Sequence, residues 1–213
     1  MRTSRALKRS LAVAAVVAST AVAFSGSAVA ATTATTTSNV PLLCPVEYQG
    51  QTYVLNYARD YTVTAPANVG RNSVFTVSFD PAPINPRTEF NTKVWDVKFV
   101  YNLPAGAKVL GYSLVGGSNL GNSKQTVEFE PGRAIVKATG PFKAGEDADV
   151  PTLKVALRAP STPGEVTTSI AGTSAADPGF RWTAEDPTTF EVGTLPCYPD
   201  PAKPVALSKT QVR

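Results

Sequence analysis

The sequence contains no histidine, and this absence closes several routes to catalysis. Without an imidazole the chain cannot assemble a Ser-His-Asp or Cys-His nucleophilic system, a histidine general base or a histidine-ligated metal. Only two cysteines are present, Cys44 and Cys197. In an exported chain such a pair predicts one disulfide, which would also exclude thiolate zinc sites and a cysteine nucleophile.

An excess of positive charge is missing as well, once the N-terminal segment is set aside. A basic start, an apolar run over 11–24 and the small residues of 28–30 predict a secretory signal peptide over residues 1–30. The whole chain has 20 basic and 16 acidic residues, and four of the basic ones lie in this segment, which leaves 16 of each sign. The remainder is neutral, so we exclude nucleic acid as a partner and expect no transmembrane span in the mature chain.

Helical periodicity is the third absence. No stretch after residue 30 repeats apolar residues at helical spacing, and 18 prolines leave little room for helices. Instead, apolar residues alternate in about ten short runs. The clearest is Lys93 to Tyr101 (KVWDVKFVY), where Trp95, Val97, Phe99 and Tyr101 are predicted to face the core. Strands without intervening helices pair antiparallel, which predicts an all-β, immunoglobulin-like antiparallel β-sandwich, with a closed β-barrel as the alternative.

The same patterns divide the chain into four parts. After the predicted signal peptide, residues 31–43 are rich in threonine and alanine and are predicted to be a disordered lead-in. Residues 44–197 form the predicted single sandwich domain. Residues 198–213 begin with closely spaced prolines and are predicted to be an extended, loose tail.

Two loops are candidates for ligand binding. Gly116 to Asn122 is rich in glycine and carries hydrogen-bonding side chains, and Asp177 to Trp182 combines a turn with an arginine beside a tryptophan. Loops at one end of a sandwich would place the two together. Each also has a purely structural interpretation, as a glycine turn and as a core aromatic pair. The candidate ligand-binding residues are Ser118, Asn119, Asn122, Asp177, Arg181 and Trp182.

Carboxylates offer the remaining chemistry. Glu128 and Glu130 share one strand face about 7 Å apart, as a glycoside hydrolase pair could, but alternation alone explains them better as a solvated outer face. A second group lies in one loop and could supply half of a calcium site: Glu146, Asp147 and Asp149. Neither group identifies a catalytic residue, and no cofactor is implied.

Three stretches carry a resemblance: GGSNLG from Gly116, AGTSAADPG from Ala171, and CYP from Cys197. Together they resemble a group of small secreted actinobacterial all-β proteins of undefined function, over roughly Cys44 to Pro199. The resemblance implies a secreted all-β protein of the cell envelope or the extracellular space. It supplies no catalytic residue.

The leading hypothesis is a secreted, non-enzymatic β-sandwich that serves as an extracellular or cell-envelope binding or structural module. Its partner would be a cell-envelope component or an extracellular protein. One alternative is a carrier that holds an apolar small molecule between the sheets, and the other is a carboxylate-dependent hydrolase.

Overall fold

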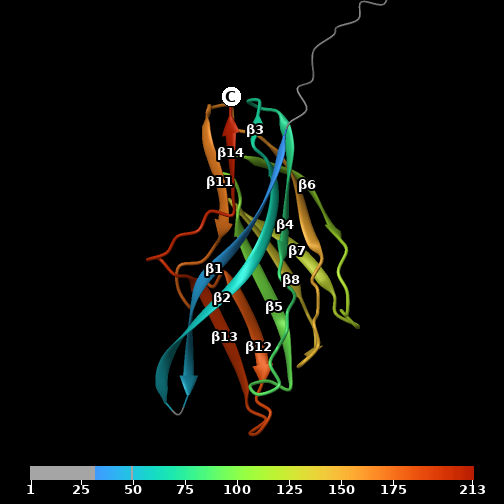
Figure 1. The fold of residues 1–213 in the computed structure, drawn as a ribbon, viewed down its shortest axis with the longest axis vertical. Helices are drawn as coiled ribbons and strands as arrows, with labels where there is room; N and C mark the ends of the chain where they lie inside the picture. The colour runs from blue at the N-terminus through green and yellow to red at the C-terminus, as the bar shows by residue number, and fades with distance from the viewer. Residues whose placement is uncertain (1–31, 49) are drawn as a thin grey trace, which may run out of the picture. The chain divides into compact units, whose positions relative to one another are not determined.

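The structure is a computed structural model that describes residues 32–48 and 50–213, and these residues contain strands and no helix (Figure 1). The predicted signal peptide lies outside the described residues. No helix that could cross a membrane occurs in this part of the chain. The predicted all-β antiparallel sandwich is confirmed.

Fourteen strands make up the described fold. In chain order they are β1 (Thr33–Tyr48), β2 (Gln51–Pro66), β3 (Asn68–Val69), β4 (Val74–Pro81), β5 (Lys93–Asn102), β6 (Lys108–Val115), β7 (Gln125–Glu130), β8 (Arg133–Ala138), β9 (Phe142–Lys143), β10 (Thr152–Arg158), β11 (Gly164–Ile170), β12 (Phe180–Glu185), β13 (Val192–Pro199) and β14 (Ser208–Val212).

The strands form two layers that are joined along one edge. The path runs β3-β14-β11-β5-β12-β13-β1-β2-β4-β10-β6, with β8 and β9 on the other edge of β5 and β7 beyond β8. The step from β13 to β1 carries the path from one layer to the other. Its two ends, β3 and β6, do not pair with each other, so the closed-barrel alternative is wrong. All pairings are antiparallel except the short one between β14 and β3.

The core lies between the layers and is built largely from aromatic rings. Tyr61 of β2 and Phe79 of β4 face Phe99 and Tyr101 of β5, and all four side chains are fully buried. The rings of Phe79 and Tyr101 stack with centroids 4.5 Å apart, and Tyr61 meets Tyr101 edge-on at 6.2 Å. Such pairs add to the apolar burial that holds the two layers together.

One feature of β5 differs from the predicted alternation. Asp96 has φ +49°, and the register against β12 shifts beside it, which is a β-bulge. The bulge exchanges the two faces, so Val94 is buried while Trp95 is only half-buried. The prediction that Trp95 faces the core is therefore wrong. From Val97 to Tyr101 the predicted inward positions are confirmed.

Both ends of the predicted domain organisation need correction. Residues 33–43, predicted to be disordered, form most of β1 and pair with β2 throughout. Threonine side chains bond across this pair, as Thr35 does with Thr64 at 2.8 Å, and Val40 is buried. The predicted loose tail contains β14, with Val212 fully buried. In both segments another strand supplies the partner that the local composition does not reveal.

Candidate functional site

The two layers separate at one end of the sandwich. β1 and β13 pair only at Leu42 with Pro199 and at Leu43 with Tyr198. Directly beyond these pairs, Cys44 and Cys197 form the predicted disulfide. Past the disulfide the two strands diverge, so that the β1–β2 hairpin and the β12–β13 hairpin end apart from each other (Figure 1).

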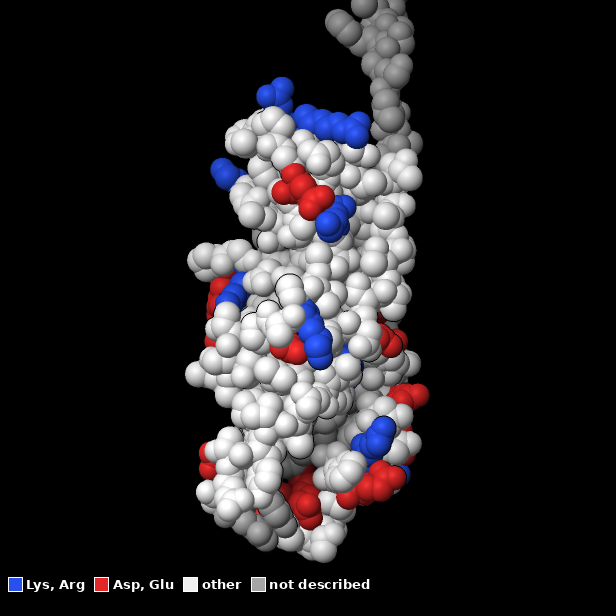
Figure 2. Space-filling view, turned by 60° about the vertical axis from the view of Figure 1, so that its left-hand side comes forward, with Lys and Arg blue, Asp and Glu red and all other residues white. Residues whose placement is uncertain are grey.

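An open cleft of about 1700 Å³ lies between these hairpins. One wall is the hairpin arm, which we define as residues 45–48 of β1 and 51–57 of β2. The other wall consists of residues 182–184 of β12 and 192–196 of β13, and the connection 83–91 closes one side. In the space-filling view the lower part of the face is hollowed, and carboxylates gather below a largely uncharged surface (Figure 2).

The inward face of β2 explains why the cleft is apolar. This face is fully buried at Tyr61, nearly so at Arg59 and half-buried at Tyr57, and it then emerges at Leu55 and Tyr53, which are 49% and 47% exposed. β2 thus presents one continuous core face, of which the opposing layer covers only the C-terminal half. The outer part of the arm lines a smaller adjoining hollow of about 520 Å³.

Other apolar side chains gather around the same opening. Phe90 on the connection is 66% exposed, and Val192 on the facing wall is 61% exposed. Phe190, at the tip of the β12–β13 hairpin, is 68% exposed. Single exposed apolar residues are ordinary, whereas several around one hollow are typical of a binding site.

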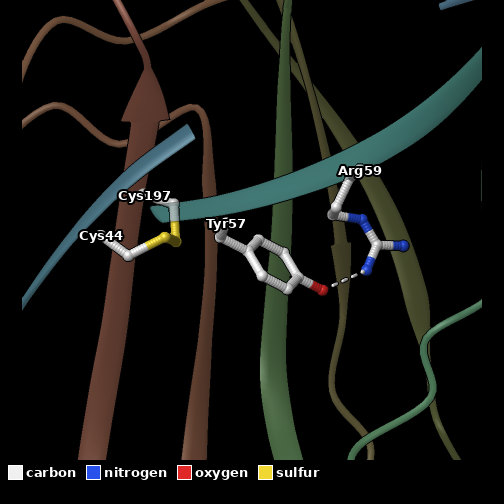
Figure 3. The surroundings of a disulfide bond; sticks show 4 residues. All are labelled: Cys44, Tyr57, Arg59 and Cys197. Carbon is white, nitrogen blue, oxygen red and sulfur yellow. Dashed lines mark hydrogen bonds between the residues drawn. A yellow bond between two sulfur atoms is a disulfide. The ribbon is translucent and has the colours of Figure 1, made fainter. Parts of the chain in front are cut away.

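Aromatic rings form the inner end of the cleft. The Tyr57 ring stacks on Phe180 with centroids 6.0 Å apart and meets Trp182 at 6.3 Å. The Tyr57 hydroxyl accepts a hydrogen bond of 3.3 Å from Nη1 of Arg59 (Figure 3). Because the hydroxyl accepts this bond, its own proton points elsewhere, and it donates no hydrogen bond to the described residues.

Arg59 is the cation of this site, and its side chain is only 5% exposed. Nη2 donates to the carbonyl of Pro83 at 3.3 Å and to that of Ala82. The guanidinium carbon lies over the ring of Phe180, 4.8 Å from its centroid, and 5.4 Å from that of Phe99. Nε is buried without a hydrogen-bond partner, and none of the ion pairs among the described residues includes Arg59.

The neighbouring phenol does not supply a counter-charge. Burial raises the pKa of the Tyr61 hydroxyl, and the nearby Arg59 opposes this only in part. Tyr61 is therefore neutral at physiological pH. The charge of Arg59 is met by carbonyl dipoles and ring faces and by no anion of the described chain.

Two unpaired strand edges border the cleft. The carbonyl of Pro41 faces β13, where it accepts from Asp200. In a strand, every second residue directs its N–H and C=O to the same edge. Glu47 lies six residues after Pro41, so its N–H and C=O also point to the β13 edge, beyond the last residue that pairs with β13. The carbonyl of Cys197 faces β12, so Thr194 presents its peptide groups toward β1. Neither edge has a strand partner among residues 32–48 and 50–213.

The predicted glycine-rich loop lies elsewhere and bonds to a neighbouring loop. Ser118 exchanges backbone hydrogen bonds of 2.9 and 3.0 Å with Asp149, and the Asn119 side chain donates to the backbone carbonyl of Asp147 at 2.9 Å. Asn119 has φ +55°, which its short polar side chain tolerates. Asn122 is exposed. This loop does not line the cleft.

The other predicted loop has a structural role at Asp177. Its carboxylate accepts two hydrogen bonds from Arg133, at 2.7 and 3.0 Å, and this arginine lowers the pKa of Asp177. Arg133 begins β8, whereas Lys124, beside the glycine-rich loop, bonds to Thr139 just beyond the end of β8. The two predicted loops therefore lie at opposite ends of β8, and the expectation that one end of the sandwich places them together is wrong.

The remaining two predicted residues lie on β12. Arg181 is half-buried, and its Nε has no hydrogen-bond partner. Trp182 is 7% exposed and packs in the core, where it also lines the cleft. This burial supports its structural interpretation, since a ring that is 7% exposed does not form an open stacking platform.

Three of the five candidate carboxylates, those of Glu128, Glu146 and Asp147, are engaged with other side chains, whereas Glu130 is exposed on β7. Glu128 pairs with Lys137 at 2.7 Å. Glu146 pairs with Lys143 at 2.8 Å, and Asp147 accepts from Asn85 at 2.6 Å. Burial raises the pKa of Asp149. Glu146, Asp147 and Asp149 are not brought together, and among the described residues no three histidine, cysteine, aspartate or glutamate side chains are grouped to hold a metal.

Sequence reasoning missed the central pair of the cleft, Tyr57 and Arg59. Their signal is present in the printed sequence. Inward positions recur at Tyr53, Leu55, Tyr57, Arg59 and Tyr61, so a single arginine falls within an apolar alternation. When the stretch is divided into two shorter runs on either side of this arginine, the orientation of Arg59 is not evident.

No family model and no curated protein matches the sequence. Solved structures do match. The Corynebacterium diphtheriae protein named "Putative membrane anchored protein" is 14% identical with a TM-score of 0.46, and the match covers 84% of this chain and 38% of that protein's length. A non-cellulosomal cohesin of Archaeoglobus fulgidus is 13% identical (TM-score 0.35; 70% and 88% covered). A cohesin module of a Clostridium perfringens family 33 glycoside hydrolase is 12% identical (TM-score 0.40; 73% and 96% covered).

Proposed function

We propose that this protein is a β-sandwich binding module that holds an extended polypeptide segment of a partner protein in the cleft between its diverging hairpins. One observation carries the proposal. β1 and β13 are neighbours in the sheet at Leu42 and Leu43, and beyond the disulfide they separate around an apolar floor and leave two unpaired strand edges.

An extended segment fits this arrangement better than a compact ligand does. Unpaired edges offer backbone donors and acceptors in a row, which is how an added strand is bound. Alternate side chains of such a strand would point into the cleft, where Leu55, Tyr57 and Trp182 form an apolar floor. The hollow is open along one side, as a chain that continues in both directions requires.

We further propose that the module acts outside the cytoplasm, as a secreted or envelope-associated protein. The predicted signal peptide and the disulfide between Cys44 and Cys197 support this, because such bonds persist in oxidising compartments. The absence of histidine from the sequence supports binding over catalysis. A test is the N-terminal sequence of the protein recovered from culture medium and from envelope fractions.

Selection of peptides tests the binding proposal. Random displayed peptides would be selected on the purified protein, and their affinities measured by fluorescence anisotropy. Leu55→Asp places a charge on the floor and should weaken binding by roughly tenfold or more, since about half of a leucine's transfer free energy is lost. Leu110→Asp is the matched control, because Leu110 on β6 is also 49% exposed and lies outside the cleft.

A separate variant tests how much the unpaired edge of β13 contributes to peptide binding. Thr194→Pro removes one outward N–H and should weaken binding, whereas Thr194→Ala removes only the side chain and should not. Equal affinities for wild-type protein and Leu55→Asp would refute the proposal. Binding of a fatty acid in the cleft by a protein that selects no peptide would refute it in favour of the carrier alternative.

A further inference from the structure

Given the proposed peptide cleft, on which this inference rests, we infer that the bound segment presents one carboxylate to the inner end of the cleft, where Arg59 and Tyr57 receive it. The site is not a general acidic surface. It consists of one buried cation and one adjacent hydroxyl, positioned by strand β2 against the aromatic floor.

The burial of Arg59 is the first argument. A charged side chain that is 5% exposed is rare unless it is paired, because removing a charge from water is energetically unfavourable. Arg59 has carbonyl partners at Ala82 and Pro83 and the ring face of Phe180, yet it forms no ion pair with the described residues. An anionic group of a bound ligand would supply the missing counter-charge.

The position of Arg59 is the second argument. Its side chain lines the cleft, at the point where the inward face of β2 passes from the core to the opening. A segment that follows this face inward ends against the guanidinium. Because the aromatic floor excludes water there, a carboxylate–guanidinium contact would be stronger than the same contact at the surface.

Tyr57 provides the third argument. Its hydroxyl accepts from Arg59 and has an unused proton, and the ring is held by stacking on Phe180. The guanidinium and this O–H are two donors at one place, which suits the two oxygens of a carboxylate. Figure 3 shows the hydroxyl directed toward the guanidinium of Arg59.

The charges at the rim restrict the number of acidic groups in the ligand. Three carboxylates line the cleft, from Glu47, Asp186 and Glu191, against one exposed arginine, Arg87. Asp186 accepts from the backbone N–H groups that follow it, which lowers its pKa and keeps it charged. A segment with many acidic residues would be repelled at the rim, so the expected ligand is apolar with a single anionic group.

The carboxylate could belong to the C-terminus of the segment or to an aspartate or glutamate side chain. Peptides selected on wild-type protein would be synthesised in three forms: with a free C-terminus, with an amidated C-terminus, and with each acidic residue replaced by its amide. Removing the relevant carboxylate should reduce affinity by roughly ten- to a hundredfold, as expected for a hydrogen-bonded charged group. The form that loses affinity identifies the source.

Variants then assign the effect to the two residues. In Arg59→Met the acid and amide forms should bind equally, and the amide form should bind as it does to wild-type protein. Tyr57→Phe keeps the ring and should reduce the acid-to-amide ratio only in part. Arg158→Met, an exposed arginine on β10 outside the cleft, is the control and should preserve the full ratio. Urea unfolding of each variant shows that it is folded.

The outcomes separate the two proposals. Peptides that bind wild-type protein equally in acid and amide forms would overturn this inference and leave the proposed function standing. An acid-to-amide ratio that persists in Arg59→Met would overturn it as well. Failure to select any peptide would remove the proposed function itself.

Discussion

Removing the disulfide should destabilise the protein strongly while leaving its strands in place. In the double variant Cys44→Ala and Cys197→Ala, alanine fills part of two fully buried positions and adds no polar group. β1 remains paired with β2 along its whole length, and Val40 and Leu42 remain buried. The principal loss therefore comes from the unfolded chain, which gains the freedom that the bond had removed.

The size of this effect follows from the position of the two cysteines. They are 153 residues apart, so the bond closes a loop that contains most of the described chain. The chain-entropy relation gives about 5 kcal/mol for a loop of this length. Since domains are typically stable by about 5–15 kcal/mol, the variant should lose a large fraction of its free energy of unfolding.

Urea unfolding followed by tryptophan fluorescence measures the change, because Trp182 is buried beside the cleft. We expect the midpoint to fall by roughly 2 M, and the slope to rise because an unlinked chain exposes more surface on unfolding. Wild-type protein reduced with dithiothreitol should match the variant. Hydrogen exchange should increase first at the N–H of Asp200, which bonds to Pro41 at the β1–β13 junction.

A clear result would refute this reasoning. If oxidised protein, reduced protein and the double variant share one midpoint and one slope, the bond does not restrict the unfolded chain. An unfolding transition that splits in two after reduction would contradict the expectation that the layers remain one cooperative unit.

Three further predictions concern stability. Arg133 lowers the pKa of Asp177 in the folded protein. The carboxylate therefore contributes about 1 kcal/mol or less to the free energy of unfolding above its unfolded-state pKa, and this contribution is lost as the pH falls through its folded-state pKa. In urea unfolding, Asp177→Asn should differ from wild type at neutral pH and match it in acid. A difference that persists in acid would contradict this. Phe180→Ala should lower the free energy of unfolding by about 3–5 kcal/mol, because it leaves a cavity under the cleft. A decrease below about 1 kcal/mol, the size expected for a surface substitution, would contradict the core position of Phe180. Gly179→Ala would bring a Cβ into collision with the carbonyl oxygen of Ala171, so we expect the free energy of unfolding to fall by about 3 kcal/mol or more. Gly193→Ala is the control, because its Cβ would have no atom within 4 Å and the change should be neutral. Equal melting temperatures for the two variants in thermal unfolding would contradict this.

Local alternation predicted the strands and the sandwich because burial on one face repeats every second residue. The same rule failed at Trp95, since the bulge at Asp96 exchanges the faces and depends on the register against β12. It failed again for residues 33–43, whose strand exists because β2 is equally long and pairs with it. These errors share one cause, which is that the pairing strand, and not the local pattern, decides the outcome.

The candidate site was the least predictable part. The composition predicted that the two cysteines pair. It did not predict that their disulfide lies where β1 and β13 diverge. The cleft exists because the inward face of β2 continues past the layer that covers it, and a sequence does not state how far an opposing strand extends. Arg59 could have been found, since an arginine at an inward position of an apolar run requires explanation.

The outer half of β2 has a mechanical consequence. Its residues before Asp60 pair with β1 alone, because β4 begins its pairing at Tyr61. A two-stranded ribbon is marginally stable by itself, and here the disulfide anchors only its base. We therefore expect the ribbon to tilt at little energetic cost, so that the width between the walls adjusts to the bulk of the occupant while the sandwich behind the anchor keeps its geometry.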